Sequence, residues 1–422
     1  MASRPKLTSK KLQALLTRIG SASSGTKSTL AERFQRDVRS IYDFHPQSPK
    51  TAAQLAECGR RLRVVSIDMG IKNLAFCDAK VAYPSSTSAA KDSLDASMHI
   101  LRWKTLNLVE GSKPTSHALD GRAASRNIEE DWTAAERDDN QFSPSVLSGT
   151  AYKFIAEEVL SADPDVVLIE KQRWRSGGGS AVQQWTLRVN TLEAMLWAVL
   201  ETVKRTHQYR SGSKKAFVSA EFDVRAVDPK RVGQYWLGQH ARALSERDEE
   251  ALAHDVSALS VGIDEPDDVG EADSKAAKKP SRSKAEKSAK IAILRSWLAE
   301  HAMSSVPSTP TRMPRIAFSI DPSAEATRQA LLPKAKAPRK SKGSKTSRAS
   351  DADIQLADEL PAAEIKKLDD VTDCFLQAAA WVAWDLNKLQ LLASLHSAKT
   401  SPSSPTIDEV EMVRMIEEVG GV

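Results

Sequence analysis

Four carboxylates lie at the ends of segments that the sequence predicts to be buried. Asp68 closes the apolar run RLRVVSIDMG, and Glu170 closes the run PDVVLIEKQ. Asp370 and Asp373 open the segment LDDVTDCFLQAAAW, where their three-residue spacing places them on one face of a helix. Asp369 is adjacent and could take the role of Asp370. Carboxylates that gather in one place repel one another unless cations neutralise them, so the combination favours a metal site.

Carboxylate oxygens suit Mg²⁺ or Mn²⁺, because hard cations prefer oxygen ligands and retained waters to sulfur or imidazole. Two such ions per site, about 4 Å apart, can generate the nucleophilic water and stabilise the leaving oxygen of a phosphodiester. Each acid alone also has a structural interpretation, as a turn residue after a strand or as a helix cap. The ordered combination, acids at two strand ends and Asp-x-x-Asp at a helix start, favours a metal-dependent nuclease.

Composition and charge indicate which other kinds of site and partner the chain could have. The 422 residues carry a net charge of +5, with basic stretches at 275–290 and 334–348 after an acidic stretch at 246–273. Such basic stretches suit loose, salt-sensitive contacts with a polyanion, or simply keep a linker soluble. The eight His and three Cys show no metal-ligand spacing. No apolar run is long enough to span a bilayer, so we expect no membrane partner.

The acids are predicted to be positioned by an α/β fold, a mixed five-stranded sheet with helices on both faces. Apolar or alternating runs predict strands, and apolar residues at helical spacing predict helices. The predicted strands are 61–70, 73–82, 99–108, 164–172 and 217–227. The predicted helices are 151–162, 182–205, 287–301 and 368–392.

The same pattern divides the chain into a core and insertions. The core is predicted at 60–235 and 285–395. Three insertions, predicted to be largely flexible, are 110–145, 245–285 and 304–365. The last of them is rich in Pro, Ser and Lys, a composition that is typical of disorder.

The basic N-terminal segment, residues 1–45, has more than one interpretation. Residues 8–37 predict two short helices joined by a turn that contains Gly25 and Lys27. The pattern KLQALLTRIGSASSGTKSTLAERF resembles the SAP motif, a small helical DNA-binding element, which would make Lys27 a DNA contact. An ordinary helical hairpin with solvated lysines would show the same pattern. Residues 1–31 contain basic residues, Ser and Thr but no acid, which is also typical of a mitochondrial transit segment.

Three motifs resemble those of the fungal mitochondrial Holliday-junction resolvases, which are related to bacterial RuvC. They are SIDMGIKNLAFC, IEKQRWRSGGGSAVQQWTLRVNTLEAML and DDVTDCFLQAAAW, and they cover about 60–230 and 365–390 in family order. The resemblance implies an RNase H-like fold, a homodimer, and paired nicking of four-way DNA junctions with Mg²⁺ or Mn²⁺. It also implies a mitochondrial location, in the matrix with the nucleoid. It assigns Asp68, Glu170, Asp370 and Asp373 as metal ligands, with Asp369 as the alternative to Asp370.

Cationic and amide side chains next to the acids form a candidate DNA surface. Guanidinium groups bind phosphates in bidentate fashion, and the glycines after Arg175 let backbone amides approach them. Trp174 could stack on a base or pack beneath the loop. The candidate DNA contacts are Lys72, Asn73, Lys171, Gln172, Arg173 and Arg175.

Two other functional classes are compatible with parts of the pattern. The first is a DNA-binding scaffold with an inactive nuclease fold, although it would not need all the acidic positions. The second is an actin-like or sugar-kinase-like ATPase, because IDMG resembles a phosphate-binding Asp-x-Gly turn. That class requires a second such turn and a Gly-rich adenosine pocket, for which SGGGS is a poor match. We therefore expect no nucleotide cofactor.

The helix predicted at 182–205 carries more apolar surface than one sheet face requires. Its large apolar side chains include Trp185, Leu192, Leu196 and Trp197. One hypothesis is that this surplus forms a dimer interface that holds two acidic sites a fixed distance apart. The alternative is a helix that is wholly buried within its own domain.

Overall fold

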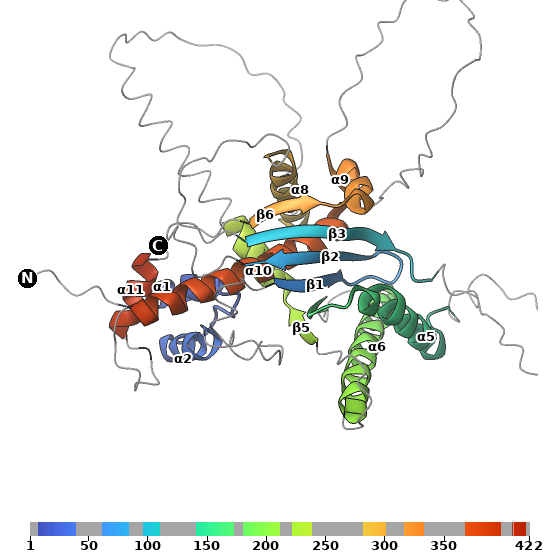
Figure 1. Cartoon of the computed structure of the whole chain (residues 1–422), viewed down its shortest axis with the longest axis horizontal. Helices are drawn as coiled ribbons and strands as arrows, with labels where there is room; N and C mark the ends of the chain where they lie inside the picture. Colours follow the sequence, from blue (N-terminus) through green and yellow to red (C-terminus); the bar gives the residue numbers. More distant parts are fainter. Residues whose placement is uncertain are drawn as a thin grey trace, which may run out of the picture.

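The computed structural model shows a six-stranded sheet covered by helices on both faces (Figure 1). The structure describes residues 7–38, 61–83, 96–109, 141–172, 180–211, 222–238, 282–300, 316–332, 368–397, 407 and 409–418. The strands are β1 (Arg61–Asp68), β2 (Leu74–Ala82), β3 (Ala96–Leu106), β4 (Val166–Glu170), β5 (Asp223–Val227) and β6 (Ile316–Ile320). Within these residues, no helix is both long enough and apolar enough to cross a lipid bilayer.

The strand order is β5-β4-β1-β2-β3-β6. The pairs β1–β2 and β2–β3 are antiparallel, whereas β4 runs parallel to β1, β5 parallel to β4, and β6 parallel to β3. Among the described strands, β2 alone therefore runs against the others. This arrangement confirms the predicted mixed α/β sheet, with six strands where the sequence predicts five.

The sixth strand corrects the prediction that 304–365 is a flexible insertion, because 316–332 is folded. Ile316, Phe318 and Ile320 alternate along β6 and pack against the core. The chain then turns through a 3₁₀ segment (Pro322–Ala324) into α9 (Glu325–Leu331), which buries Leu331. The Pro, Ser and Lys around this segment hide its alternation in the sequence. The remainder of 304–365 lies outside the described residues.

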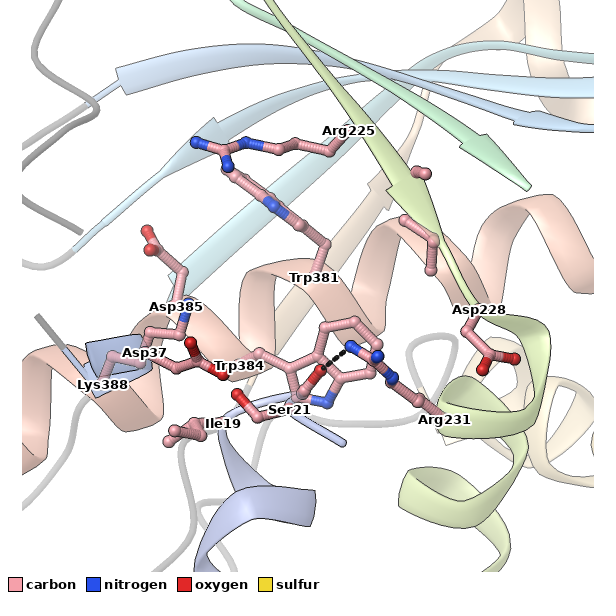
Figure 2. A pocket seen from close by; sticks show the side chains of 13 residues that line it. Ile19, Ser21, Asp37, Arg225, Asp228, Arg231, Trp381, Trp384, Asp385 and Lys388 are labelled. Carbon is pink, nitrogen blue, oxygen red and sulfur yellow. Dashed lines mark hydrogen bonds between the residues drawn. The ribbon is translucent and has the colours of Figure 1, made fainter. Parts of the chain in front are cut away.

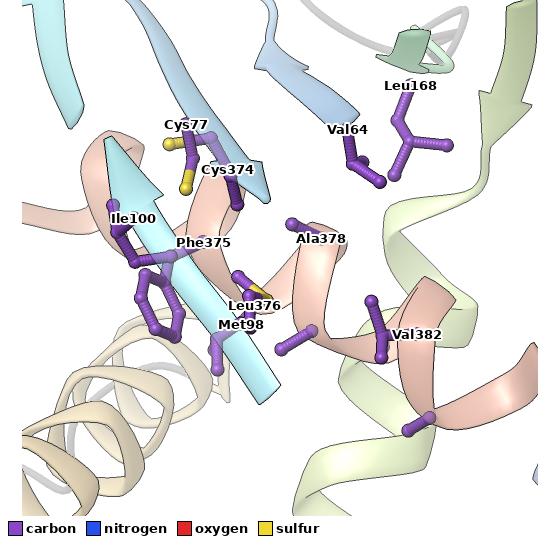
Figure 3. Close-up of a cluster of buried hydrophobic side chains, with 14 of the residues drawn as sticks. Val64, Cys77, Met98, Ile100, Leu168, Cys374, Phe375, Leu376, Ala378 and Val382 are labelled. Carbon is purple, nitrogen blue, oxygen red and sulfur yellow. The ribbon is translucent and has the colours of Figure 1, made fainter. Parts of the chain in front are cut away.

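Each face of the sheet packs against its own layer of helices, because successive strand residues point to opposite faces. On one face, α10 (Leu368–Ser397) and α8 (Arg282–Glu300) cover alternate residues of the strands. Figure 3 shows this cluster, in which Cys374, Phe375, Leu376, Ala378 and Val382 of α10 lie close to Val64, Cys77, Met98, Ile100 and Leu168 of the strands.

On the opposite face, α5 (Pro144–Phe154) and α6 (Ser180–Ser211) cover the other set of strand residues, among them Ile67 and Phe76. After α5 the chain continues through a π-helical turn (Ile155–Val159) and a 3₁₀ turn (Leu160–Ala162). These elements confirm the helix predicted over 151–162 and extend it toward the N-terminus.

The packing of α6 limits which of its residues could form a dimer interface. Leu192 and Leu196 are fully buried in the core of their own chain, so they cannot contribute to a dimer interface as the sequence suggests. Trp197 is partly buried against the same core. Trp185 and Leu187, in contrast, keep 39% and 57% of their surface exposed.

The N-terminal segment folds as the predicted pair of helices, α1 (Ser9–Arg18) and α2 (Lys27–Val38). The pair is not a separate module, however. Its apolar faces form one buried cluster with the end of α10 and with α11 (Glu409–Glu418). Figure 1 shows α1, α2 and α11 together at one end of α10. The apolar spacing predicts the two helices but cannot indicate their partners, which are more than 350 residues away in the chain.

Polar contacts attach the helical pair to the core. Asn387 in α10 donates its Nδ2 proton to the carbonyl of Arg18 (2.8 Å), and Arg231 donates to the carbonyl of Gly20 (3.1 Å). The Arg231 contact borders a pocket of about 200 Å³, which Trp384 also lines; Figure 2 shows the pocket with this contact as a dashed line. The α1–α2 pair is therefore part of the same folded body as the sheet.

Candidate active site

Two of the predicted acids meet because adjacent parallel strands end at the same edge of the sheet. Ile67 of β1 is in register with Ile169 of β4, so the next residues, Asp68 and Glu170, lie side by side at the carboxyl ends of the strands. Glu170 Oε2 accepts a hydrogen bond from the backbone N–H of Met69 (3.4 Å). The carboxyl ends of neighbouring strands in an open α/β sheet are a common location for ligands.

The first turns of α10 bring the other acids to the same edge. Gln377 is buried and donates to Ser66 Oγ (3.1 Å) and to the carbonyl of Ile67 (3.2 Å), the residue just before Asp68. Trp103 in β3 donates its indole N–H to the carbonyl of Val371 (2.9 Å). These bonds fix the helix start beside the end of β1.

The pKa of Asp68 shows that the carboxylates share one environment. Burial raises the pKa of the Asp68 carboxyl well above its usual value, because it disfavours the charged form. A hydrogen bond with Glu170 and the negative charge of Glu170 raise it further, and the charges of Asp373 and Asp370 add to the effect. Burial also raises the pKa of Asp373, against the lowering influence of Lys290. The structure thus brings together the four acids that the sequence singles out.

Asp369 and Asp370 occupy different positions. Asp369 Oδ2 forms an ion pair with Lys287 Nζ of α8 (2.5 Å). Asp370 contributes to the negative field at Asp68. This difference favours Asp370 over Asp369 as the partner of Asp373 in the acidic cluster.

The donor set suits hard divalent ions. Its ligand atoms are carboxylate oxygens, and the raised pKa of Asp68 reflects crowded negative charge that a cation would relieve. As folded, no three Asp, Glu, His or Cys side chains among the described residues stand close enough together to form a ready-made metal cage.

The turn after Asp68 carries two of the candidate DNA contacts, Lys72 and Asn73. Gly70 makes this turn tight, because a Cβ there would be 2.8 Å from the carbonyl oxygen of Asn73. Lys72 is exposed, and its Nζ lies 5.7 Å from the ring centroid of Phe142, which Arg188 of α6 also covers at 4.2 Å. A cationic and aromatic rim thus borders the acids on the α6 side.

The residues after Glu170 are only partly described. Lys171 is exposed, and Gln172 donates its side-chain amide to Glu170 Oε2 (3.2 Å). Arg173 and Arg175 lie outside the described residues.

Lys27 is not part of this site. It forms an ion pair with Glu409 of α11 (2.9 Å), at the opposite end of α10 from the acids. With a rise of 1.5 Å per residue, the length of α10 places it about 30 Å away.

Sequence reasoning misses three residues close to the acids. Glu193 of α6 accepts a hydrogen bond from the backbone N–H of Gln172 (3.3 Å), and burial raises the pKa of its carboxyl. Lys287 and Lys290 of α8 pair with Asp369 and Asp373. The basic composition of 275–290 indicates a solvated stretch, yet Lys290 precedes Ile293 and Leu294 at helical spacing, which places it on the buried face.

Comparisons with known proteins find similarity to one family and to one curated relative. The family model described as mitochondrial resolvase Ydc2 / RNA splicing MRS1 matches residues 64–391. The mitochondrial cruciform cutting endonuclease 1 of Schizosaccharomyces pombe is 28% identical over 174 residues, which are 41% of this chain and 52% of that protein. The match therefore spans only about half the length of this relative.

Two solved structures are similar in part. The yeast mitochondrial Holliday junction resolvase Ydc2 aligns over 93% of this chain and 99% of its own, with 18% identity and a TM-score of 0.43. The Thermus thermophilus RuvC structure aligns over 41% of this chain and 68% of its own, with 13% identity and a TM-score of 0.21. Because the family model spans well over half of the residues, including all four acids, the chain belongs to the mitochondrial resolvase Ydc2 / RNA splicing MRS1 family.

Proposed function

We propose that this protein is a metal-dependent endonuclease that resolves four-way DNA junctions. The observation that carries the proposal is the convergence of Asp68, Glu170, Asp370 and Asp373 at one edge of the sheet, with the pKa of Asp68 raised by burial and by its acidic neighbours. Family membership and the name of the Schizosaccharomyces pombe relative, a cruciform cutting endonuclease, support the same conclusion.

The four acids would hold two Mg²⁺ or Mn²⁺ ions, which supply a nucleophilic water and stabilise the leaving oxygen when bound. Asp68 is the more buried of the two strand-end acids and faces carboxylates from both β4 and α10, so it would be a central ligand of the metal site. Lys72 and Lys171, both exposed beside the acids, would hold the phosphates that flank the scissile bond. Gln172 would keep the Glu170 carboxylate oriented.

Cleavage of a mobile four-way junction, compared with a linear duplex of identical sequence, tests the proposal. We expect Mg²⁺-dependent nicks at symmetric positions of the junction and at least about tenfold slower cutting of the duplex, which corresponds to about 1.4 kcal/mol of discrimination. Equal rates on both substrates would show a nuclease without junction specificity. Absence of cutting on both, with Mg²⁺ and with Mn²⁺, would contradict the nuclease proposal.

The family description also includes RNA splicing, so a nucleic-acid-binding scaffold is the alternative. The two functions differ in what they require of the acids. A scaffold would bind junction or structured RNA without metal and would gain nothing from a crowded acidic cluster. A protein that binds the junction tightly but leaves it uncut at saturating Mg²⁺ would therefore favour the scaffold.

We further propose that the protein acts as a homodimer, because a four-way junction offers two equivalent strands to a two-fold symmetric partner. The candidates for the interface are the apolar side chains that remain exposed on the α5–α6 face, namely Tyr152, Trp185 and Leu187.

The mitochondrion is the proposed location, in the matrix with the nucleoid, supported by the relative's name and by the basic N-terminal segment. Cleavage after residue 31 would remove α1, whose Leu12 and Leu16 are fully buried, so we expect the imported protein to retain α1.

A further inference from the structure

Helix α8 places two lysines against the acidic start of α10. Lys290 Nζ lies 3.0 Å from Asp373 Oδ1, and Lys287 Nζ lies 2.5 Å from Asp369 Oδ2. The two acids are one turn apart on α10, and the two lysines are one turn apart on α8. The two ion pairs therefore link α8 to α10, directly beside the proposed metal ligands.

The backbone that carries these lysines is held in place, because α8 is firmly packed. Ile293, Leu294 and Leu298 are buried in the core that contains α10. Trp297 packs against the ring of Trp236 (centroids 4.7 Å apart) and stacks on Phe318 (5.4 Å). The helix position is thus set by apolar contacts rather than by the ion pairs.

Lys290 itself is confined. Its side chain keeps only 10% of its surface exposed, and its Cε would be 3.7 Å from a Cβ atom at Gly233, in the helix of residues 229–238. A buried ammonium without a counter-charge is strongly disfavoured, so Lys290 is expected to stay next to a carboxylate. Lys287 pairs in the same way but is about half exposed.

We infer that Lys290, assisted by Lys287, is a built-in counter-ion that stabilises the metal-free acidic site and competes with the divalent ions for the acids of α10. Asp373 Oδ1 cannot serve an ammonium group and a divalent ion at full strength, and a fixed positive charge a few ångströms away opposes the entry of a cation by Coulomb repulsion. The lysines would thus hold the site folded without metal and keep its metal affinity moderate. This inference rests on the proposed metal-dependent function.

The test is a Mn²⁺ titration of the full-length protein without DNA. Binding is measured by calorimetry or by the electron paramagnetic resonance signal of free Mn²⁺. Lys290→Met retains the apolar stem and removes the charge, so we expect Mn²⁺ to bind about tenfold more tightly. Lys290→Arg keeps the charge and should bind as the native protein does. Lys287→Met should show a smaller gain, because solvent screens that pair.

Lys104→Met is the matched control. Lys104 forms an ion pair of the same length with Glu158 (3.0 Å), within a separate network next to the π-helical turn. Its replacement removes the same charge and should leave Mn²⁺ affinity unchanged. In the absence of metal, Lys290→Met should melt at a lower temperature than the native protein, and saturating Mn²⁺ should remove most of that difference.

Unchanged or weaker Mn²⁺ binding by Lys290→Met would overturn the inference, while the proposed nuclease function would stand if the native protein binds Mn²⁺ and cuts junctions. If the native protein binds no Mn²⁺, both the inference and the metal-dependent function fail. Should Lys290→Met not fold, Lys287→Met decides the question, because its exposed side chain can be replaced without loss of the core; unaltered affinity in that variant would overturn the inference.

Discussion

Gly20, in the connection between α1 and α2, lies directly against the indole ring of Trp384 in α10. A Cβ atom at residue 20 would be 2.2 Å from ring atom Cδ2, and the backbone φ of +72° is in the left-handed region that favours glycine. The N-terminal pair and the core thus meet with no side chain between them at this point. Gly20 is therefore the residue at which the docking of the N-terminal pair can be tested most directly.

Gly20→Ala should lower the free energy of unfolding by about 1–3 kcal/mol, because the added methyl group forces Trp384 or the backbone to move. Urea denaturation followed by tryptophan fluorescence measures the change. Gly149→Ala is the control: residue 149 lies within α5, and a Cβ there meets no atom within 4 Å. That variant should gain stability, by about 0.5–1 kcal/mol. Equal stability of Gly20→Ala and the native protein would contradict the close docking.

Asp68→Asn should stabilise the metal-free protein at neutral pH. The pKa of Asp68 is raised in the folded state, so its contribution to stability is fully present below the unfolded pKa of about 3.9 and is lost as the pH rises through the folded value. The amide removes this loss, and we expect a melting temperature in EDTA at pH 7–8 that is higher by at least about 2 °C.

The same measurement has an internal check. The gain from Asp68→Asn should shrink as the pH is lowered toward 4, and added Mg²⁺ should raise the melting temperature of the native protein more than that of the variant. Glu201→Gln, on the exposed surface of α6, serves as the control for removal of one carboxylate. A variant that is less stable than the native protein in EDTA at neutral pH would mean that Asp68 is held by favourable contacts, not crowded by charge.

The N-terminal pair can be tested for DNA binding without removing it. Deletion of 7–38 would expose the apolar residues that α10 and α11 cover, so a truncated protein that fails to bind would not be informative. Lys10→Gln with Lys11→Gln changes two lysines outside the buried cluster and should preserve the fold. If the pair binds DNA, junction affinity falls and the slope of log K against log salt decreases by about 0.9 for each phosphate that the protein no longer neutralises. An unchanged slope would leave the pair a structural role only.

The exposed apolar residues of α6 make the dimer proposal testable. Leu187→Glu should shift the protein toward monomer in light scattering at micromolar concentration, because a buried charge is costly at an interface. Val410→Glu, on the exposed face of α11, is a control of similar exposure and should leave the oligomeric state unchanged. A native protein that is monomeric even with a junction bound would contradict paired cutting by a preformed dimer.

The strands and the acids can be predicted from sequence because their signals are local. The run from Arg61 to Asp68 combines β-branched residues with a terminal acid, and α10 begins with Asp residues that favour a helix N-terminus. The sequence leaves the choice between Asp369 and Asp370 open, since adjacent residues on a helix differ only in the direction they face. The ion pair of Asp369 with Lys287 and the contribution of Asp370 to the negative charge at Asp68 favour Asp370 as the ligand.

Other features depend on contacts between distant segments. β6 is short and surrounded by disorder-promoting residues, and only its pairing with β3 makes it a strand. Lys290 resembles any other lysine of a basic stretch until α8 packs on α10. Because Gly20 and Trp384 lie near opposite ends of the chain, no local sequence pattern predicts their contact.

The single-turnover rate of junction cutting by Glu170→Gln at saturating Mg²⁺ is the most direct test of the proposed active site. Glu170 ends β4 next to Asp68, and the amide keeps the side-chain shape while removing the charge that the ions would require. We expect junction binding close to that of the native protein and a cutting rate lower by at least about 10²–10³-fold, with Glu201→Gln as the control. A Glu170→Gln variant that cuts at the native rate would contradict the assignment of these carboxylates as the catalytic metal site.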